Sequence, residues 1–293
     1  MSVLHSIDLP QAPQRVVSLV PSMTESLFDL GLGGAVVGIT DYCTQPAGRL
    51  GGLPRLGGPK NPHVDQILAL QPDLVIAGWE ENTRQPVEAL QAAGVPVWIT
   101  FPRSVTGTLE VLYEMARLFR SALAQSRVQT LEITVEWAGA ALASGQALRY
   151  FCPIWRQPAQ DAAPWWMTFN AETYCSDILR LAGGVNIFDD RTRRYPLAAD
   201  LGQTAAEDPA GRDARYPRVT LEEILAGQPQ LVLLPDEPYS FSAAEREEVL
   251  ALLGDTPAGR AGRVHLVDGS LITWPGTRLA RALQQLPGLF GLA

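Results

Sequence analysis

The chain contains one phrase twice. Residues 64–78 read VDQILALQPDLVIAG and residues 221–235 read LEEILAGQPQLVLLP, with seven of fifteen paired positions identical. Each copy predicts a short amphipathic helix that opens with an acidic residue, ends at Gln-Pro and leads into an apolar strand, because proline cannot continue a helix. Two similar units predict a molecule of two lobes, with a ligand cleft between the lobes and one carboxylate, Asp65 or Glu222, on each.

Strands and helices alternate along both halves of the chain. In the first half, the apolar runs 15–20, 35–40 and 95–100 are separated by segments with helical spacing, and a similar pattern resumes at 148–155. Such alternation is typical of a parallel sheet wrapped by helices. We therefore predict an α/β protein with two Rossmann-like αβ lobes, each built on a parallel central sheet.

The middle of the chain has a different pattern. Apolar residues recur at helical spacing from about 105 to 143 without an internal proline. This pattern predicts one long helix over 105–145 that joins an N-terminal lobe (1–104) to a C-terminal lobe (146–293). The alternative is two ordinary helices with a break near Gln125 and Ser126.

Composition excludes some classes of function. A chain of 293 residues is long enough for two domains, and its net charge of −8 argues against a nucleic-acid-binding surface. No apolar run approaches the length of a membrane span. The first residues, MSVLHSIDLPQAPQRVVSLV, do not read as a secretory leader. We expect a cytoplasmic protein if Met1 is the native start, and a periplasmic or cell-surface protein if a leader was removed.

Signals for catalysis or metal binding are scarce. The sequence contains no GxSxG, HExxH or Walker A motif. Its three cysteines form no CxxC pair, and its three histidines form no set with metal-ligand spacing. We expect buried thiols, no catalytic residues, no metal site, no intrinsic cofactor and no enzymatic activity.

Aromatic side chains follow the predicted strands. Ligands of parallel αβ sheets bind at the carboxyl ends of the strands, and five of the seven tryptophans fall near those ends. Aromatic faces of this area suit a large, flat or partly apolar ligand, although each tryptophan could instead cap a core. The candidate ligand-binding residues are Ser22, Tyr42, Trp79, Phe101, Arg103, Trp155, Trp165, Trp166 and Trp274.

Two segments, 155–169 and 189–217, have no counterpart in the first half. Long loops of this kind are often functional. The second one contains Arg191, Arg193, Arg194, Arg212 and Arg215. Those arginines are either part of a solvated surface loop or a lid that recognises an anionic group, since guanidinium groups pair well with carboxylates and phosphates.

Several motifs together resemble a known family. RVVSLVPSMTE, DQILALQPDLVIA, LAGGVNIF and LEEILAGQPQLVLL, with the long middle helix, resemble the substrate-binding proteins of ABC importers that have a helical backbone between two lobes. That class serves vitamin B12, ferric siderophores and haem, and the likeness is closest to its vitamin B12-binding proteins. It extends from about residue 15 to residue 289.

The resemblance implies partners and roles. In that family an acidic residue on each lobe docks onto arginines of the membrane permease, and Asp65 and Glu222 match those positions, with aspartate at 65 replacing the usual glutamate. The alternative is two solvated carboxylates at helix starts, where the helix dipole favours them. The resemblance also implies a monomer that contacts permease subunits and a small-molecule ligand.

The resemblance leaves the ligand open. Tyr42 and Trp79 match aromatic ligand contacts of the family, but its corrinoid-contacting Asp and Arg near the last strand are Ser270 and Trp274 here. A corrinoid such as vitamin B12 is the favoured ligand, with a ferric siderophore or haem as alternatives. Two further alternatives are a cytoplasmic corrinoid or cofactor carrier and a cofactor-processing enzyme.

Overall fold

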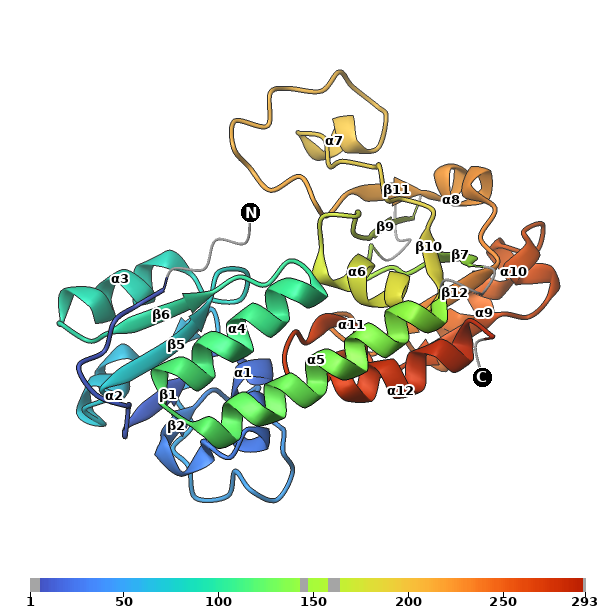
Figure 1. Cartoon of the computed structure of the whole chain (residues 1–293). Coiled ribbons are helices and arrows are strands. Elements are labelled where there is room, and N and C mark those ends of the chain that lie inside the picture. The colour runs from blue at the N-terminus through green and yellow to red at the C-terminus, as the bar shows by residue number, and fades with distance from the viewer. Residues whose placement is uncertain (1–5, 143–146, 158–163, 292–293) are drawn as a thin grey trace. The chain divides into compact units, whose positions relative to one another are not determined.

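The computed structural model describes residues 6–142, 147–157 and 164–291. The chain divides into two compact units, shown as ribbons in Figure 1. The first unit contains residues 1–136 and 274–280, and the second contains residues 137–273 and 281–293. Each unit is an αβ structure with a parallel central sheet, which confirms the predicted fold class.

The sheet of the first unit has the strand order β2-β1-β5-β6. These strands are Val36–Ile39, Val16–Ser18, Leu74–Gly78 and Val97–Thr100, and every neighbouring pair is parallel. The accompanying helices are α1 (Pro21–Asp29), the 3₁₀ turn Gly33–Ala35, α2 (Val64–Ala69), α3 (Arg84–Ala92) and α4 (Val105–Leu118). A hairpin of β3 (Gly57–Gly58) and β4 (Asn61–Pro62) lies between β2 and α2 in the chain. Strand residues such as Val17 and Val75 pack with Ile67 of α2 and Leu90 of α3 in one buried cluster.

The sheet of the second unit repeats this topology with the order β10-β7-β12-β13. Its strands are Gly184–Asn186, Leu148–Phe151, Leu231–Pro235 and Val264–Val267, again all parallel. Its helices are α6 (Tyr174–Leu181), α8 (Leu221–Gly227), α9 (Ala243–Leu252), α10 (Pro257–Arg260) and α11 (Ser270–Thr273), and most of α12 (Leu279–Leu289) belongs to it. In both units the first strand lies between the second and the third.

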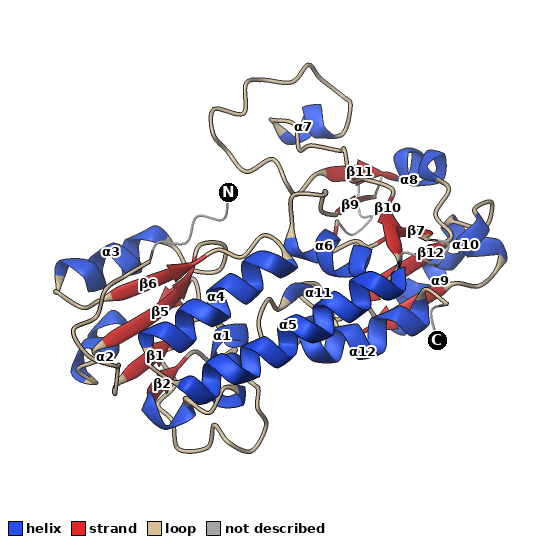
Figure 2. Cartoon of the chain, viewed as in Figure 1, coloured by secondary structure: helices blue, strands red, loops and turns tan. Residues whose placement is uncertain are grey.

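The second unit also has a small antiparallel sheet with the order β11-β9-β8. Its strands, marked in red in Figure 2 with those of the central sheets, are Arg218–Thr220, Trp165–Met167 and Trp155–Arg156. The short helix α7 (Leu197–Asp200) belongs to the segment 189–217 that precedes β11. Residues 158–163 of the expected loop 155–169 lie outside the described residues.

The repeated phrase forms the same structure twice. Its first copy is α2 followed by β5, and its second copy is α8 followed by β12, so each copy supplies an inner strand of its sheet. Gln71 and Gln228 end the two helices with φ angles of 48° and 46°. A left-handed residue followed by proline terminates a helix abruptly. The match in backbone conformation confirms that the two copies are equivalent.

The single helix expected over 105–145 is instead two helices. α4 ends at Leu118 and α5 extends over Ala122–Leu142, while residues 143–145 lie outside the described residues. The break is at Arg120, with φ 50°, and residues 125–126 are inside α5. The Arg120 guanidinium donates to the carbonyl of Pro10, 2.8 Å away. The 21-residue α5 is the long helix that continues from the first unit into the second.

Residues 274–280 belong to the first unit, although the expected C-terminal lobe would have included them. The Arg278 guanidinium donates to both carboxylate oxygens of Glu25 in α1, each at 2.7 Å. The Thr277 hydroxyl donates to Asp29 at 2.8 Å. Gly276 comes so close to α1 that a Cβ there would lie 2.4 Å from Ser26 Oγ, so a side chain would disrupt the contact. These contacts hold the segment against α1.

Candidate functional site

The carboxyl edge of the first sheet brings several predicted residues into one row. Tyr42 follows β2, Trp79 follows β5, and Phe101 and Arg103 follow β6. Because the strands are parallel neighbours, the residues that follow them emerge at the same edge. Three of these four residues, Tyr42, Trp79 and Phe101, are aromatic.

Trp79 and Phe101 form an aromatic pair at this edge. Their ring centroids are 6.2 Å apart with an interplanar angle of 36°. The Arg103 guanidinium carbon lies 5.9 Å from the centre of the Phe101 ring, at the outer limit of a cation–π contact. The Trp79 side chain is 65% exposed, although its backbone amide is bonded to Thr100. An exposed indole on an anchored backbone is available for stacking.

Tyr42 and Ser22 differ in accessibility. Tyr42 is 64% exposed and lies beside the β3–β4 hairpin, where a Cβ on Gly58 would be 3.5 Å from its ring. Ser22 lies in the first turn of α1 and is only 3% exposed, with no hydrogen-bond partner for its hydroxyl among the described residues. The Ser22 hydroxyl is therefore buried, and its contact with a ligand stays a prediction.

Trp274 is positioned by the first unit. Its ring faces the Arg278 guanidinium at 4.8 Å, and Arg278 is held by the buried Glu25. A guanidinium that stacks on an indole and also forms a bidentate ion pair has little freedom to rotate. Trp274 is therefore part of the first unit, although it follows the last strand of the second unit in the sequence. Its spacing in the sequence could not indicate this.

The second unit presents Trp155 after β7. Trp155 begins β8, is 41% exposed and makes an edge contact with Tyr239 at 5.4 Å. Tyr239 follows β12, and its hydroxyl donates to Glu245 at 2.6 Å. The adjacent ends of β7 and β12 thus bring together two aromatic rings far apart in the sequence.

Trp165 and Trp166 are neighbours in β9 and lie on opposite faces of the small sheet. Trp165 is half-buried, whereas Trp166 is 2% exposed and packs in the core with Phe151 and Val219. Successive side chains of a strand alternate between faces. The prediction that Trp166 binds a ligand is therefore wrong, because it is a core residue. Strand alternation would have separated the pair if β9 had been identified from sequence.

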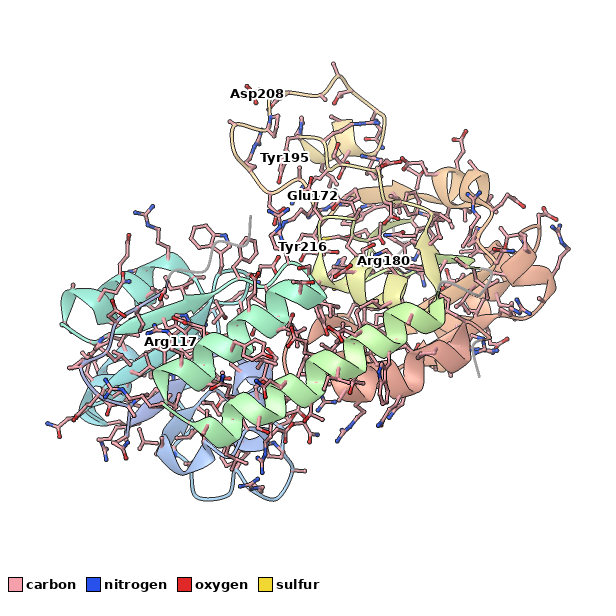
Figure 3. The ribbon with its side chains drawn as sticks, viewed as in Figure 1. Arg117, Glu172, Arg180, Tyr195, Asp208 and Tyr216 are labelled. Carbon is pink, nitrogen blue, oxygen red and sulfur yellow. The ribbon has the colours of Figure 1, made fainter. Side chains whose placement is uncertain are left out.

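The side chains of four of the five arginines in segment 189–217 interact within the second unit. Arg191 is ion-paired with Asp200 and Glu223, each at 3.0 Å, and Arg215 is paired with Asp213 at 2.6 Å. The guanidiniums of Arg193 and Arg212 lie 4.3 and 4.0 Å from the ring centre of Tyr195, labelled in Figure 3. The fifth, Arg194, is exposed. Segment 189–217 is therefore not a wholly solvated loop.

These features agree with comparisons to known proteins. The sequence family described as periplasmic binding protein matches residues 16–271. The chain belongs to the periplasmic binding protein family. A vitamin B12-binding protein of Yersinia pestis (strain Pestoides F) is 27% identical over 234 residues, which cover 79% of this chain and 73% of the relative.

Solved structures agree in fold. The periplasmic vitamin B12-binding protein of Vibrio cholerae has a TM-score of 0.74 at 22% identity, covering 96% of this chain and 98% of the other. The periplasmic haem-binding protein of Roseiflexus sp. RS-1, in its apo form, has a TM-score of 0.72 at 24% identity, covering 94% and 97%. At these identities the likeness establishes the fold of the binding protein and leaves its ligand undetermined.

Asp65 and Glu222 occupy the same place in the two units of this binding protein. Each is the second residue of its helix, α2 or α8, and each is exposed. Within the described ranges, neither carboxylate forms a hydrogen bond or an ion pair with another side chain.

The described residues offer no metal site and no exposed cysteine. Across residues 6–142, 147–157 and 164–291, no group of three His, Cys, Asp or Glu side chains could hold a metal ion. Cys43, Cys152 and Cys175 are buried, and burial raises the pKa of the Cys152 thiol well above its ordinary value. A buried thiol of raised pKa is a poor nucleophile. Among the described helices, none is both long and apolar enough to cross a membrane.

Proposed function

We propose that this chain is the substrate-binding component of an ABC-type importer and that its ligand is a bulky ring compound, with a corrinoid such as vitamin B12 favoured. The observation that carries the proposal is the exposed aromatic surface at the carboxyl edges of two equivalent sheets, with Trp79 on one and Trp155 on the other. The vitamin B12-binding relative from Yersinia pestis supports the choice of ligand.

Aromatic rings are suited to hold such a ligand without reacting with it. A large side chain with few rotatable bonds contributes contact area at little entropic cost. The Trp79 ring is restrained by its contact with Phe101, and the Trp155 ring by its contact with Tyr239. Such restraint reduces the entropy lost on binding. The site is proposed to bind and release its ligand unchanged.

Haem is the second candidate ligand. The Asp and Arg expected to contact a corrinoid are replaced by Ser270 and Trp274, and the haem-binding protein of Roseiflexus shares the fold. The Ser270 hydroxyl donates to Asp268, and Trp274 faces Arg278, so neither reproduces an Asp–Arg pair. Because of this replacement, haem and a ferric siderophore remain candidate ligands beside a corrinoid.

Asp65 and Glu222 are proposed as the residues that dock onto the permease. They are equivalent by sequence repeat and by helix position, and each is exposed in the first turn of its helix. One accessible carboxylate on each unit could engage arginines of two permease subunits. Interfacial charges of this kind set orientation and the rate of encounter.

A titration with cyanocobalamin tests the function directly. Tryptophan quenching, checked by calorimetry, should show saturable one-to-one binding at micromolar affinity or tighter. Trp79→Ala should weaken binding by more than about 1 kcal/mol, as expected for loss of a stacking residue. Trp137→Ala is the matched control, since Trp137 is 75% exposed on α5 and follows no strand.

The outcomes separate the candidates. If cyanocobalamin does not bind, haemin and ferric siderophores are titrated under the same conditions, and binding of one of them reassigns the ligand. If none of these compounds binds, the capture function is refuted. An unaltered affinity of a folded Trp79→Ala protein would show that the first edge is not the ligand surface.

The compartment is proposed to be the periplasm or the cell surface, in line with the family of periplasmic binding proteins. Cell fractionation with an antibody to the chain tests this proposal. Recovery in the cytoplasmic fraction would favour a cytoplasmic corrinoid or cofactor carrier instead.

A further inference from the structure

The small antiparallel sheet of the second unit has two chemically different faces. Pairing across it aligns Arg156 with Trp166 and Trp166 with Val219. These three side chains are buried, with exposures of 4%, 2% and 0%. This face therefore packs on the core.

The opposite face contains the residues at alternate positions. Trp155 pairs with Met167, Met167 pairs with Arg218, and the next pair on the same face is Trp165 with Thr220. Side chains of directly opposed residues in an antiparallel sheet have Cβ atoms about 4.5–5.5 Å apart. We name these five residues the outer face. Trp155 is exposed and the other four are half-buried, so this face is not part of the core.

A positive charge without a carboxylate partner lies on the outer face. The Arg218 guanidinium donates to the carbonyl of Tyr216 at 3.0 Å and, among the described residues, forms no ion pair. Burial lowers the pKa of Arg218, and the charge of Arg193 lowers it further, although Asp200 acts in the opposite direction. The backbone amides of Arg194 and Arg218 both donate to the Asp200 carboxylate, at 2.9 and 2.8 Å, so the chain at Arg193 lies beside Arg218.

The nearby carboxylates are already engaged. Asp200 accepts hydrogen bonds from the Arg191 guanidinium and from the backbone amides of Arg194 and Arg218. Asp213 is paired with Arg215. In the part of the chain that the structure describes, Arg193 also lacks an ion pair and instead faces the Tyr195 ring at 4.3 Å. The other arginine of the small sheet, Arg156, is by contrast paired with Glu248.

We propose that the outer face binds the ring of the ligand and that Arg218, together with Arg193, recognises an anionic oxygen group on that ligand, either a carboxylate or a phosphodiester. This inference rests on the proposed function and adds the chemical class that the ligand must have. An anion between two guanidiniums relieves their repulsion and accepts charge-assisted hydrogen bonds. Trp155, Trp165 and Met167 supply the apolar and polarizable contact surface.

Two pairs of probes test the proposal. Protoporphyrin IX carries carboxylates and its dimethyl ester does not. Cyanocobalamin carries a phosphodiester in its nucleotide loop, and dicyanocobinamide lacks that whole loop, so in this pair the response to Arg218→Gln identifies the contribution of the anion. Each probe is titrated against the wild-type protein, Arg218→Gln, Arg218→Lys and Arg193→Gln by tryptophan quenching. Arg180→Gln is the control variant, because Arg180 is an exposed arginine on α6 and is not part of the small sheet.

The expected result is a preference of the wild-type protein for the anionic member of at least one pair. Arg218→Gln should weaken binding of that member by at least about tenfold, as expected for loss of a charged hydrogen bond, and leave the neutral member unchanged. Arg218→Lys should retain part of the preference, and Arg193→Gln should lower it independently. The pair that shows the preference identifies the anion as a carboxylate or a phosphodiester.

Three results would overturn the proposal: equal wild-type affinity for both members of each pair, equal weakening of both members by Arg218→Gln, or no binding of any of the four probes. Circular dichroism confirms that each variant is folded, and Arg193→Gln replaces Arg218→Gln if the latter is not. Equal binding of both members refutes the anion site alone and leaves the capture function standing. If none of the four probes binds, the siderophore titration decides the capture function separately.

Discussion

The two units share the topology of their central sheets and differ in the segments attached to the strand ends. Both sheets have the same strand order, and the repeated helix and strand occupy the same place in each. In the first unit the aromatic residues beyond the strand ends, such as Trp79 and Tyr42, are largely exposed on loops. In the second unit the chain after β7 forms β8, and the small antiparallel sheet is added beside it.

The two units also differ in the contacts that stabilise these segments. Segment 189–217, the added segment of the second unit, is held by buried charge: Asp200 is only 1% exposed and is bonded to Arg191 and to two backbone amides. In the first unit the comparable buried ion pair, Glu25 with Arg278, holds residues 274–280. The same sheet topology can therefore carry edge residues that are positioned by loops or by an additional folded layer.

The substitution with the largest expected effect tests whether the two copies of the repeat have equivalent functions in the two units. Asp65→Arg combined with Glu222→Arg should abolish ligand uptake by a reconstituted importer and leave ligand affinity unchanged, because like charges at a docking surface repel. Either single substitution should reduce uptake partially. The control is Glu88→Arg combined with Asp255→Arg, which makes the same change in net charge at other exposed sites. Unchanged uptake by the Asp65 and Glu222 variant would refute the docking role.

The second prediction concerns the two faces of the small sheet, which the first unit lacks among its described residues. Trp166→Ala should lower the free energy of unfolding by about 3–5 kcal/mol, as expected for removal of a buried aromatic side chain. Trp165→Ala should have a much smaller effect, because Trp165 is half-buried on the outer face. Denaturant unfolding followed by circular dichroism measures both. Equal losses would contradict the assignment of the two side chains to opposite faces.

The third prediction concerns the buried charge that supports the added segment. Asp200→Ala should lower the free energy of unfolding by about 3–5 kcal/mol, because it removes one partner of a buried ion pair and leaves two amides unsatisfied. Asp190→Asn is the control in the same segment, since Asp190 is exposed and should change stability by no more than about 0.5 kcal/mol. If Asp200→Ala were as mild as the control, the segment would not depend on this carboxylate.

The smallest expected effect is a dependence of stability on pH in the second unit. Burial lowers the pKa of His265 in β13, and the charges of Arg246 and Arg263 lower it further, from an ordinary value of 6.5. The unfolded chain therefore takes up this proton at a higher pH than the folded chain. The stabilisation is fully present above the ordinary value and is lost as the pH falls below it.

Unfolding free energies measured from about pH 8 to about pH 5 should therefore decline less in His265→Gln than in the wild-type protein. Identical slopes for the two proteins would show that His265 does not titrate differently on folding.

Local patterns predicted a large part of the molecule. The repeated phrase, the Gln-Pro helix ends and the apolar runs correctly indicated two αβ units with parallel sheets, because these signals depend on backbone geometry within a few residues. For the same reason, Tyr42, Trp79, Phe101 and Trp155 lie after strands as expected. The predicted helix over 105–145 was continuous, and the alternative placed a break at residues 125–126 instead of at Arg120, because residues 118–121 contain neither proline nor glycine.

The sequence by itself therefore determined the fold class, the internal repeat and which residues lie beyond the strand ends. Only the tertiary structure decided that Trp166 is a core residue, that Ser22 is enclosed, that Trp274 belongs to the first unit and that Arg191 is paired with Asp200. These outcomes depend on contacts between residues far apart in the chain, such as Arg278 and Glu25, which are separated by 253 positions. Sequence periodicity records which side of an element is apolar, whereas packing between elements determines what that side contacts.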